Sequence, residues 1–191
     1  MQIEYEATFI DINKDEVRAR LAAAGAELAR PEFLQKRIVF SLPSGHESEG
    51  GWLRVRDEGN KITMSFKIVA GRNIEDQKEL CLRVDSFDNA VNFLAAVGCG
   101  KKSYQETKRE LWLLDGTEIT IDEWPYLEPF VEVEGSSEEA VRAASVKIGF
   151  NYADALFCAT DELYEKKYGV SKDIINNCTP RITFGDPNPF I

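Results

Sequence analysis

Residues 3–9 read IEYEATF, and residues 130–134 read FVEVE near the other end of the chain. In each stretch apolar and polar side chains alternate with the period of two that is typical of a β-strand. This alternation puts Glu4 and Glu6 on one face of the first strand, and Glu132 and Glu134 on one face of the second. Carboxylates this close repel one another. They therefore predict either a divalent cation, Mg²⁺ or Mn²⁺, or a facing row of Arg and Lys.

The composition predicts one domain. With 191 residues, of which 43% are hydrophobic, the chain is long enough for one sizeable core and short for two. We therefore expect a single domain over residues 1–191, with a core at 1–165 and a helical or irregular tail at 166–191. Four cysteines without a CxxC pair favour reduced thiols.

Charge and hydropathy exclude several partners. A formal net charge of −10 argues against nucleic acid and against an anionic membrane surface, since both are bound by clustered Lys and Arg. No apolar run approaches the roughly 20 residues of a spanning helix, and the N-terminus lacks a secretory signal pattern. We therefore expect a cytoplasmic protein. The sequence does not indicate its oligomeric state.

Further strands and helices follow from the pattern. Six more stretches alternate at period two, namely residues 34–42, 52–56, 61–69, 77–84, 104–114 and 117–124. Helices are predicted after a capping box at Asn13 and Glu16, over residues 86–97, after Ser136 with Glu139, and over 153–168. Most connections are too short for parallel crossovers. The prediction is an α+β fold in which an eight-stranded antiparallel sheet curls or closes and helices cover its apolar face.

Sorting the strand positions by parity gives one charged face of mixed sign. A cavity lined this way suits an elongated polyanion, with acids holding a divalent metal and bases gripping phosphate oxygens. A small-molecule triphosphate is the expected partner. The set consists of Glu4, Glu6, Arg37, Arg54, Arg56, Lys67, Glu79, Arg109, Asp122, Glu132 and Glu134.

Simpler readings apply to single features. Charged residues that alternate in one strand usually mark a solvated face, and only the set as a whole favours a cavity. The loop at 44–51 lacks the Lys-Ser/Thr of a phosphate loop, and His46 is expected to be exposed within it. Trp52, Trp112 and Trp124 could stack a ring at the mouth of the cavity, although large aromatics more often fill packing.

In order along the chain, these residues resemble the CYTH superfamily, the triphosphate tunnel proteins that include class IV adenylyl cyclases and thiamine triphosphatases. The resemblance spans roughly residues 1–165. It is carried by Glu4-x-Glu6, Leu53-Arg-Val-Arg56, Phe66-Lys67, Lys108-Arg109-Glu110, Ile121-Asp122 and Phe130-Val-Glu-Val-Glu134. It implies a closed eight-stranded antiparallel tunnel. The family motif ExExK has Thr8 at its third charged position here, where a hydroxyl can donate to a phosphate oxygen but brings no positive charge.

The leading functional hypothesis is metal-dependent hydrolysis of a triphosphate, either inorganic or organic. In it Glu4, Glu6, Glu132 and Glu134 hold Mg²⁺ or Mn²⁺, and Asp122 orients a ligand or water. The phosphate-binding residues would be Arg37, Arg54, Arg56, Lys67, Arg109 and Thr8. One alternative is a class IV adenylyl cyclase that converts ATP to cyclic AMP. The other is a binding module that holds a phosphorylated ligand without turnover.

Overall fold

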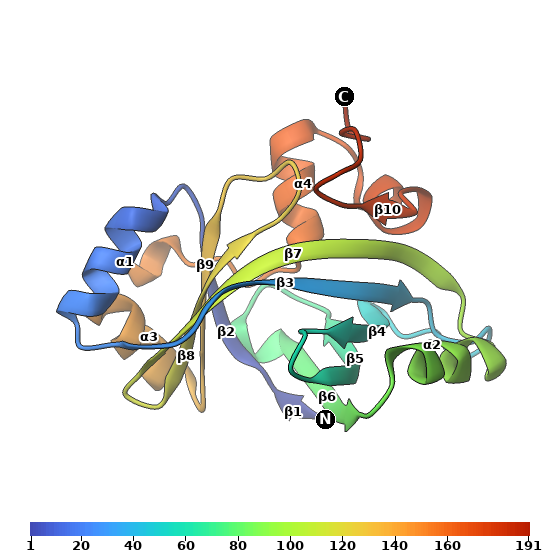
Figure 1. Cartoon of the computed structure of the whole chain (residues 1–191), viewed down its shortest axis with the longest axis horizontal. Helices are drawn as coiled ribbons and strands as arrows, with labels where there is room; N and C mark the ends of the chain where they lie inside the picture. Colours follow the sequence, from blue (N-terminus) through green and yellow to red (C-terminus); the bar gives the residue numbers. More distant parts are fainter.

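An antiparallel sheet that curls round on itself forms the body of the molecule (Figure 1). The computed structural model describes every residue from Met1 to Ile191. Along the sheet the strands follow the order β1 (Gln2–Ile3), β6 (Gln77–Val84), β5 (Ile62–Val69), β4 (Gly51–Asp57), β3 (Glu27–Phe40), β7 (Lys101–Leu114), β8 (Thr117–Glu123), β9 (Phe130–Gly135) and β2 (Tyr5–Phe9). The pairings along this path are all antiparallel.

The N-terminal segment joins the two ends of the sheet. Strands β1 and β2 are separated only by Glu4, yet β1 pairs with β6 and β2 pairs with β9. The sheet is therefore a nearly closed barrel of nine strands. Because β1 and β2 are two pieces of one predicted strand, this path confirms the predicted eight-stranded antiparallel tunnel.

Strands β3 and β7 are longer than predicted. The pattern indicated residues 34–42 and 104–114, whereas the strands span Glu27–Phe40 and Lys101–Leu114. Their pairing shifts register between Leu28 and Arg30 and again between Arg30 and Phe33. Such bulges add residues to one strand and break the alternation of side chains. Pro31 lies in this irregular part. The irregularity explains why the alternating pattern places the start of β3 too late in the sequence.

Helices cover the outside of the barrel, as predicted. α1 (Lys14–Ala23) and α3 (Glu138–Lys147) pack on the outer face of β2, β8 and β9 (Figure 1). α2 (Phe87–Ala96) packs on β3, β4 and β5. The largest core cluster joins Ala7 and Phe9 of β2 with Val17 of α1 and Val141 of α3. Ala7 and Phe9 alternate with Glu6 along β2, so the strand pattern separates an apolar outside from a charged inside.

The C-terminal part is more ordered than predicted. The expected helix over 153–168 is a short 3₁₀ turn at Tyr152–Asp154 followed by α4 (Thr160–Tyr168). After a π-helical turn at Ile174–Cys178, β10 (Arg181–Ile182) pairs in parallel with β7. Phe190 packs against Tyr164 and Tyr168 and ties the end of the chain to the barrel. The final residues after β10 form no helix or strand, as expected for the tail.

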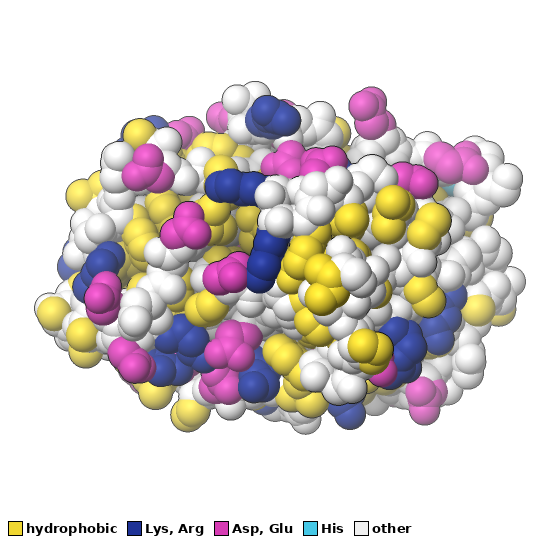
Figure 2. Space-filling model, turned by 90° about the horizontal axis from the view of Figure 1, so that it is seen from above, with side chains coloured by type: hydrophobic (Ala, Val, Ile, Leu, Met, Phe, Trp, Pro, Cys, Tyr) yellow, Lys and Arg dark blue, Asp and Glu magenta, His cyan; other side chains and the backbone are white.

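The surface carries mixed charge. Figure 2 shows acidic, basic and hydrophobic side chains interspersed over one face, without a continuous basic band across the view. A continuous basic surface is the usual electrostatic footprint of nucleic-acid binding, so this face does not indicate it. None of the helices is both long and apolar enough to cross a membrane.

Helix caps give a test of the fold. Asn13 caps α1 as predicted, and Ser86 caps α2, but the cap of α3 is Ser137 and not Ser136. The Ser137 hydroxyl accepts from the Ala140 amide, so Ser137→Ala should lower the free energy of unfolding by about 1 kcal/mol. Urea denaturation measures this. Ser136→Ala is the matched control, and an equal loss in both variants would contradict the assignment.

Candidate active site

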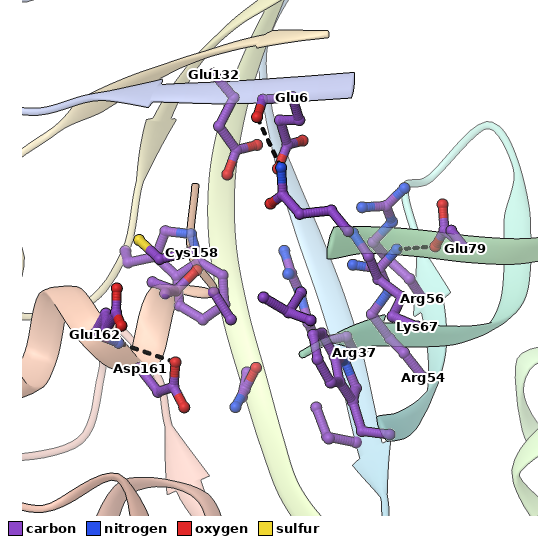
Figure 3. A pocket seen from close by; sticks show the side chains of 18 of the residues that line it. Glu6, Arg37, Arg54, Arg56, Lys67, Glu79, Glu132, Cys158, Asp161 and Glu162 are labelled. Carbon is purple, nitrogen blue, oxygen red and sulfur yellow. Dashed lines mark hydrogen bonds and ion pairs between the residues drawn. The ribbon is translucent and has the colours of Figure 1, made fainter. Parts of the chain in front are cut away.

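Charged side chains from most strands of the barrel converge on one cavity. The cavity has a volume of about 640 Å³. Figure 3 shows Glu6 and Glu132 projecting into it at one end, with Arg37, Arg54, Arg56 and Lys67 across from them. Of the predicted site residues, all except Thr8 and Asp122 line this cavity, namely Glu4, Glu6, Arg37, Arg54, Arg56, Lys67, Arg109, Glu132 and Glu134. Assigning strand residues to the two faces of the sheet by their odd or even position therefore identified most of the side chains that face the interior.

Three glutamates form a tight acidic cluster. Glu4, Glu6 and Glu134 each place a carboxylate oxygen so that the three oxygens lie within 4.8 Å of one another. The strand register explains this, because Glu6 lies opposite Glu134 and Glu4 sits at the break between β1 and β2. Hard divalent cations prefer carboxylate oxygens, so the donor set fits Mg²⁺ or Mn²⁺.

Burial and mutual repulsion hold protons in this cluster. Burial, followed by the charges of Glu132 and Glu4, raises the pKa of Glu6 well above its ordinary value. Burial and Glu4 also raise the pKa of Glu134. For Glu132, burial and the neighbouring Asp122 raise the pKa to about 7. A bound cation would relieve the repulsion that causes part of these shifts.

Glu132 does not belong to the three-glutamate cluster. Its carboxylate accepts from Nη2 of Arg109 at 2.5 Å. The structure thus gathers three of the four glutamates that were predicted to hold a metal, and the fourth is held by an arginine. In the β2–β9 pair Glu132 lies opposite Thr8, two residues away from the Glu6–Glu134 pair.

Asp122 binds the Arg109 guanidinium and does not itself line the cavity. Its side chain is fully buried and accepts from Nε of Arg109 at 2.7 Å and from Nη2 at 2.8 Å. The Thr120 hydroxyl donates to the same carboxylate at 2.7 Å. These contacts occupy both carboxylate oxygens, so Asp122 does not reach the cavity. The prediction that it orients a ligand or water directly is not supported by this placement, because the Arg109 guanidinium lies in between.

The opposite wall is strongly basic. Arg54 pairs with Glu79 at 3.0 Å, and Arg56 pairs with Glu58 at 2.8 Å. Burial, and then the charges of Arg54 and Arg56, lower the pKa of Arg37 well below its ordinary value. Burial and the charge of Arg54 lower the pKa of Arg56 to about 10. This wall therefore carries more buried positive charge than its own carboxylates neutralise.

Several buried donors on this wall have no partner. The Nε atoms of Arg37, Arg54 and Arg56 make no hydrogen bond within the protein, and neither does the amide nitrogen of Gln35. A buried donor without an acceptor costs free energy, which an anion in the cavity would recover. The arrangement favours a ligand with several acceptor oxygens.

Lys67 bridges the two walls. Its ammonium lies 2.7 Å from the nearer Glu4 oxygen and is almost fully buried. Burial lowers the pKa of Lys67, but the charges of Glu4, Glu6 and Glu79 together outweigh it, so the pKa is raised. Lys67 therefore stays charged at the boundary between the acidic cluster and the arginines.

Neutral residues hold Arg37 in place. Its guanidinium lies 4.6 Å from the Trp124 ring centre, and Nη2 donates to Gln35 at 2.9 Å. Thr107 contacts both Arg37 and Gln35. The strand parity marked these positions as inward, but neutral side chains gave no signal of a role. Trp124 fulfils the packing role and also supports an arginine.

Thr8, which was predicted to contact phosphate, lies outside the cavity lining. Only 4% of its surface is exposed. Its backbone forms an isolated bridge with Leu156, with both hydrogen bonds at 2.9 Å. The chain after α3 thus covers the position of the third motif residue.

A third wall comes from the C-terminal part, which the sequence did not predict as part of the site. Cys158, Asp161 and Glu162 line the cavity next to α4 (Figure 3), together with Lys172 and Asn176. Glu162 accepts from Lys172 at 2.8 Å, and Asp161 accepts from Asn176 at 2.6 Å. Burial raises the pKa of the Cys158 thiol, which disfavours its reactive thiolate form.

Solved structures share the fold at low identity. A putative adenylate cyclase from Vibrio parahaemolyticus matches with a TM-score of 0.72 at 15% identity, over 86% of this chain and 98% of that one. A protein from Pyrococcus horikoshii matches with a TM-score of 0.69 at 20% identity, over 84% and 98%. A putative adenylyl cyclase from Hippeastrum, described with a dominant triphosphatase activity, matches with a TM-score of 0.54 at 14% identity, over 90% and 97%.

A search of curated proteins finds no match. The model of the CYTH domain family matches residues 2–156, which is most of the chain. This range begins in β1 and ends at Leu156, and it contains every predicted site residue. The chain belongs to the CYTH domain family.

Proposed function

We propose that this protein hydrolyses the terminal phosphate of a triphosphate with the help of Mg²⁺ or Mn²⁺. The observation that carries the proposal is the division of one cavity into two halves. Three glutamate oxygens within 4.8 Å lie on one side, and buried arginine donors without partners lie on the other. A polyphosphate chain with its metal ion satisfies both halves at once.

The acidic and the basic residues of the cavity have different proposed roles. Glu4, Glu6 and Glu134 would hold the metal, which when bound supplies a Lewis acid and a bound water of lowered pKa. Arg37, Arg54 and Arg56 bind the phosphate oxygens and stabilise the charge that spreads over them in the transition state.

Arg109 and Lys67 lie between these two groups. Arg109 is held rigidly by Asp122 and Glu132, so its guanidinium is in place before a substrate enters. Lys67 is placed to contact the phosphate nearest the metal, since it lies beside Glu4.

Similar structures support the class of reaction. The Hippeastrum protein was described with a dominant triphosphatase activity, and other neighbours were described as putative adenylate cyclases. Hydrolysis is favoured here because the groups described above all act on the phosphate chain. Purified protein with Mn²⁺ and tripolyphosphate should release orthophosphate. Cyclic AMP and pyrophosphate from ATP would instead indicate a cyclase, and turnover of neither substrate would indicate a binding module.

Glu6→Gln tests the metal site. The substitution removes one ligand, so we expect hydrolysis to fall at least about a hundredfold. It also removes a buried carboxylate that is repelled by its neighbours, so the metal-free variant should be at least as stable as the wild type. Phosphate release and thermal unfolding measure the two effects. Glu49→Gln, in an exposed loop, is the control, and unchanged turnover in Glu6→Gln would contradict the metal site.

Metal affinity should increase with pH. Cation binding needs charged carboxylates, while two of the three proposed ligands, Glu6 and Glu134, carry raised pKa values. Mn²⁺ affinity should therefore strengthen by up to about tenfold per pH unit and per displaced proton as pH rises through the titration of these two carboxyls. Calorimetry in buffers of different ionisation enthalpy counts the released protons. Binding without proton release near neutral pH would contradict this expectation.

The stability of the metal-free protein should change with pH in the opposite direction. The folded state binds these protons more tightly than the unfolded chain, so the free energy of unfolding falls as pH rises from the ordinary glutamate pKa through about 7. Saturating Mn²⁺ should remove this loss. Urea denaturation at several pH values, with and without the metal, measures it; stability that rises over this range without metal would contradict the proton assignment.

Arg56→Gln tests the anion wall. Loss of a charge-assisted contact should weaken tripolyphosphate binding by about 1.5–3 kcal/mol, or roughly ten- to a hundredfold. Lys61 still pairs with Glu58 in the variant, which limits damage to the fold. Binding is measured without metal to isolate this wall. Arg72→Gln, at an exposed site outside the cavity, is the control, and equal binding by both variants would contradict the role of Arg56.

A further inference from the structure

Strand β6 has an open edge. It pairs with β5 along its full length, from Gln77 to Val84. On its other side, β1 pairs with Lys78 and Glu79 only. Residues 80–84 therefore have a strand neighbour on one side alone, at the place where the barrel is not fully closed.

The backbone groups at this edge can be assigned by alternation. The Gln77 carbonyl accepts from the Glu4 amide at 2.9 Å, so Gln77 directs its backbone groups towards β1. Every second residue of a strand points its N–H and C=O to the same side, which assigns Glu79, Cys81 and Arg83 to this edge as well. Beyond β1, Cys81 and Arg83 thus offer two donors and two acceptors to another strand.

The side chains of this segment do nothing to block pairing. Residues 80–84 read LCLRV, without the proline, lysine or bulge that usually protects an edge strand. Leu80 and Leu82 are each 50% exposed on the outer face, which none of the helices covers at this point. An edge with open hydrogen-bonding groups and exposed leucines has the properties of a pairing surface.

We propose that β6 pairs in antiparallel fashion with β6 of a second copy of this chain, about a two-fold axis at Leu82. In this register Cys81 lies opposite Arg83 of the second copy, and the reverse pair is identical. The two pairs form four backbone hydrogen bonds. Leu82 meets its own counterpart, and Leu80 faces Val84 of the second copy, so the exposed leucines become buried.

Charge and space select this register. With the axis at Leu82, residue 85 of the second copy falls opposite Glu79, which is already paired with Gln2, so the second strand must turn away after Val84, where β6 ends. An axis at Cys81 would instead require Arg83, which lies within the strand, to take that occupied place. An axis at Arg83 would place two arginines directly opposite each other, which is destabilising. With the axis at Leu82, Arg83 of the second copy is the diagonal neighbour of Glu79, within reach of an ion pair. The edge is therefore complementary to itself in hydrogen bonding, in hydrophobic contact and in charge.

Sedimentation equilibrium tests the dimer. Because a contact of one short strand pair is small, we expect a dissociation constant of roughly micromolar order. Leu82→Lys places like charges on the axis and should weaken association at least tenfold. Leu113→Lys, at a similarly exposed leucine of the fully paired strand β7, should leave it unchanged. A monomeric wild type at high concentration, or equal effects of both substitutions, would overturn the proposal.

Disulfide crosslinking tests the register. In a background in which the exposed Cys81 and Cys178 are replaced by serine, Leu82→Cys should form a covalent dimer on mild oxidation, since the two Cβ atoms face each other across the axis. Leu80→Cys is the matched control and should not crosslink, because it faces Val84 of the second copy. Mass spectrometry identifies the bond. Equal crosslinking of both variants, or none in Leu82→Cys, would overturn this register.

Discussion

The structure depends on placing like charges together inside a closed sheet. Glu4, Glu6 and Glu134 are held within contact of one another by strand pairing, and the buried arginines are held likewise on the facing wall. Neither group is stable by itself in a low-dielectric interior. A ligand that is both cationic and anionic, such as a metal polyphosphate, relieves both. The fold thus holds an unfavourable charge arrangement that substrate binding can offset.

The barrel makes this arrangement possible through its N-terminal strand. One short segment, broken at Glu4, joins β6 on one side and β9 on the other. It brings two glutamates to the seam where the first and last strands of the fold meet. The same break leaves Glu4 free to approach Lys67, so closure of the barrel and contact between acidic and basic walls occur together.

Much of the fold and of the site lining could be predicted from the sequence, because alternation at period two assigns each strand residue to a face. Parity placed Glu6, Arg54 and Glu132 inside, and their side chains line the cavity. Parity does not show how far along the barrel axis a side chain lies. Thr8 and Asp122 have the same parity, yet Thr8 is covered by Leu156 and Asp122 lies behind Arg109.

Alternation assigns no position to residues that lie outside the strands. The wall formed by Cys158, Asp161 and Lys172 comes from a segment whose position depends on packing of Phe190 and on the pairing of β10 with β7. The contacts of Gln35 and Thr107 with Arg37 could not be predicted, because neutral side chains carry no charge pattern. Parity also could not show that Glu132 is held by an arginine, since Arg109 comes from β7, which is separated from β9 by β8 in the sheet.

In the proposed function one cavity holds a metal at its acidic side and phosphates at its basic side. A crystal structure with Mn²⁺ and a non-hydrolysable triphosphate analogue is the decisive test, because anomalous scattering locates the metal. We expect a metal peak about 2 Å from oxygens of Glu4, Glu6 or Glu134, with phosphates against Arg37, Arg54 and Arg56. A metal held only at the outer surface, or a ligand that leaves these arginines without a partner, would contradict it.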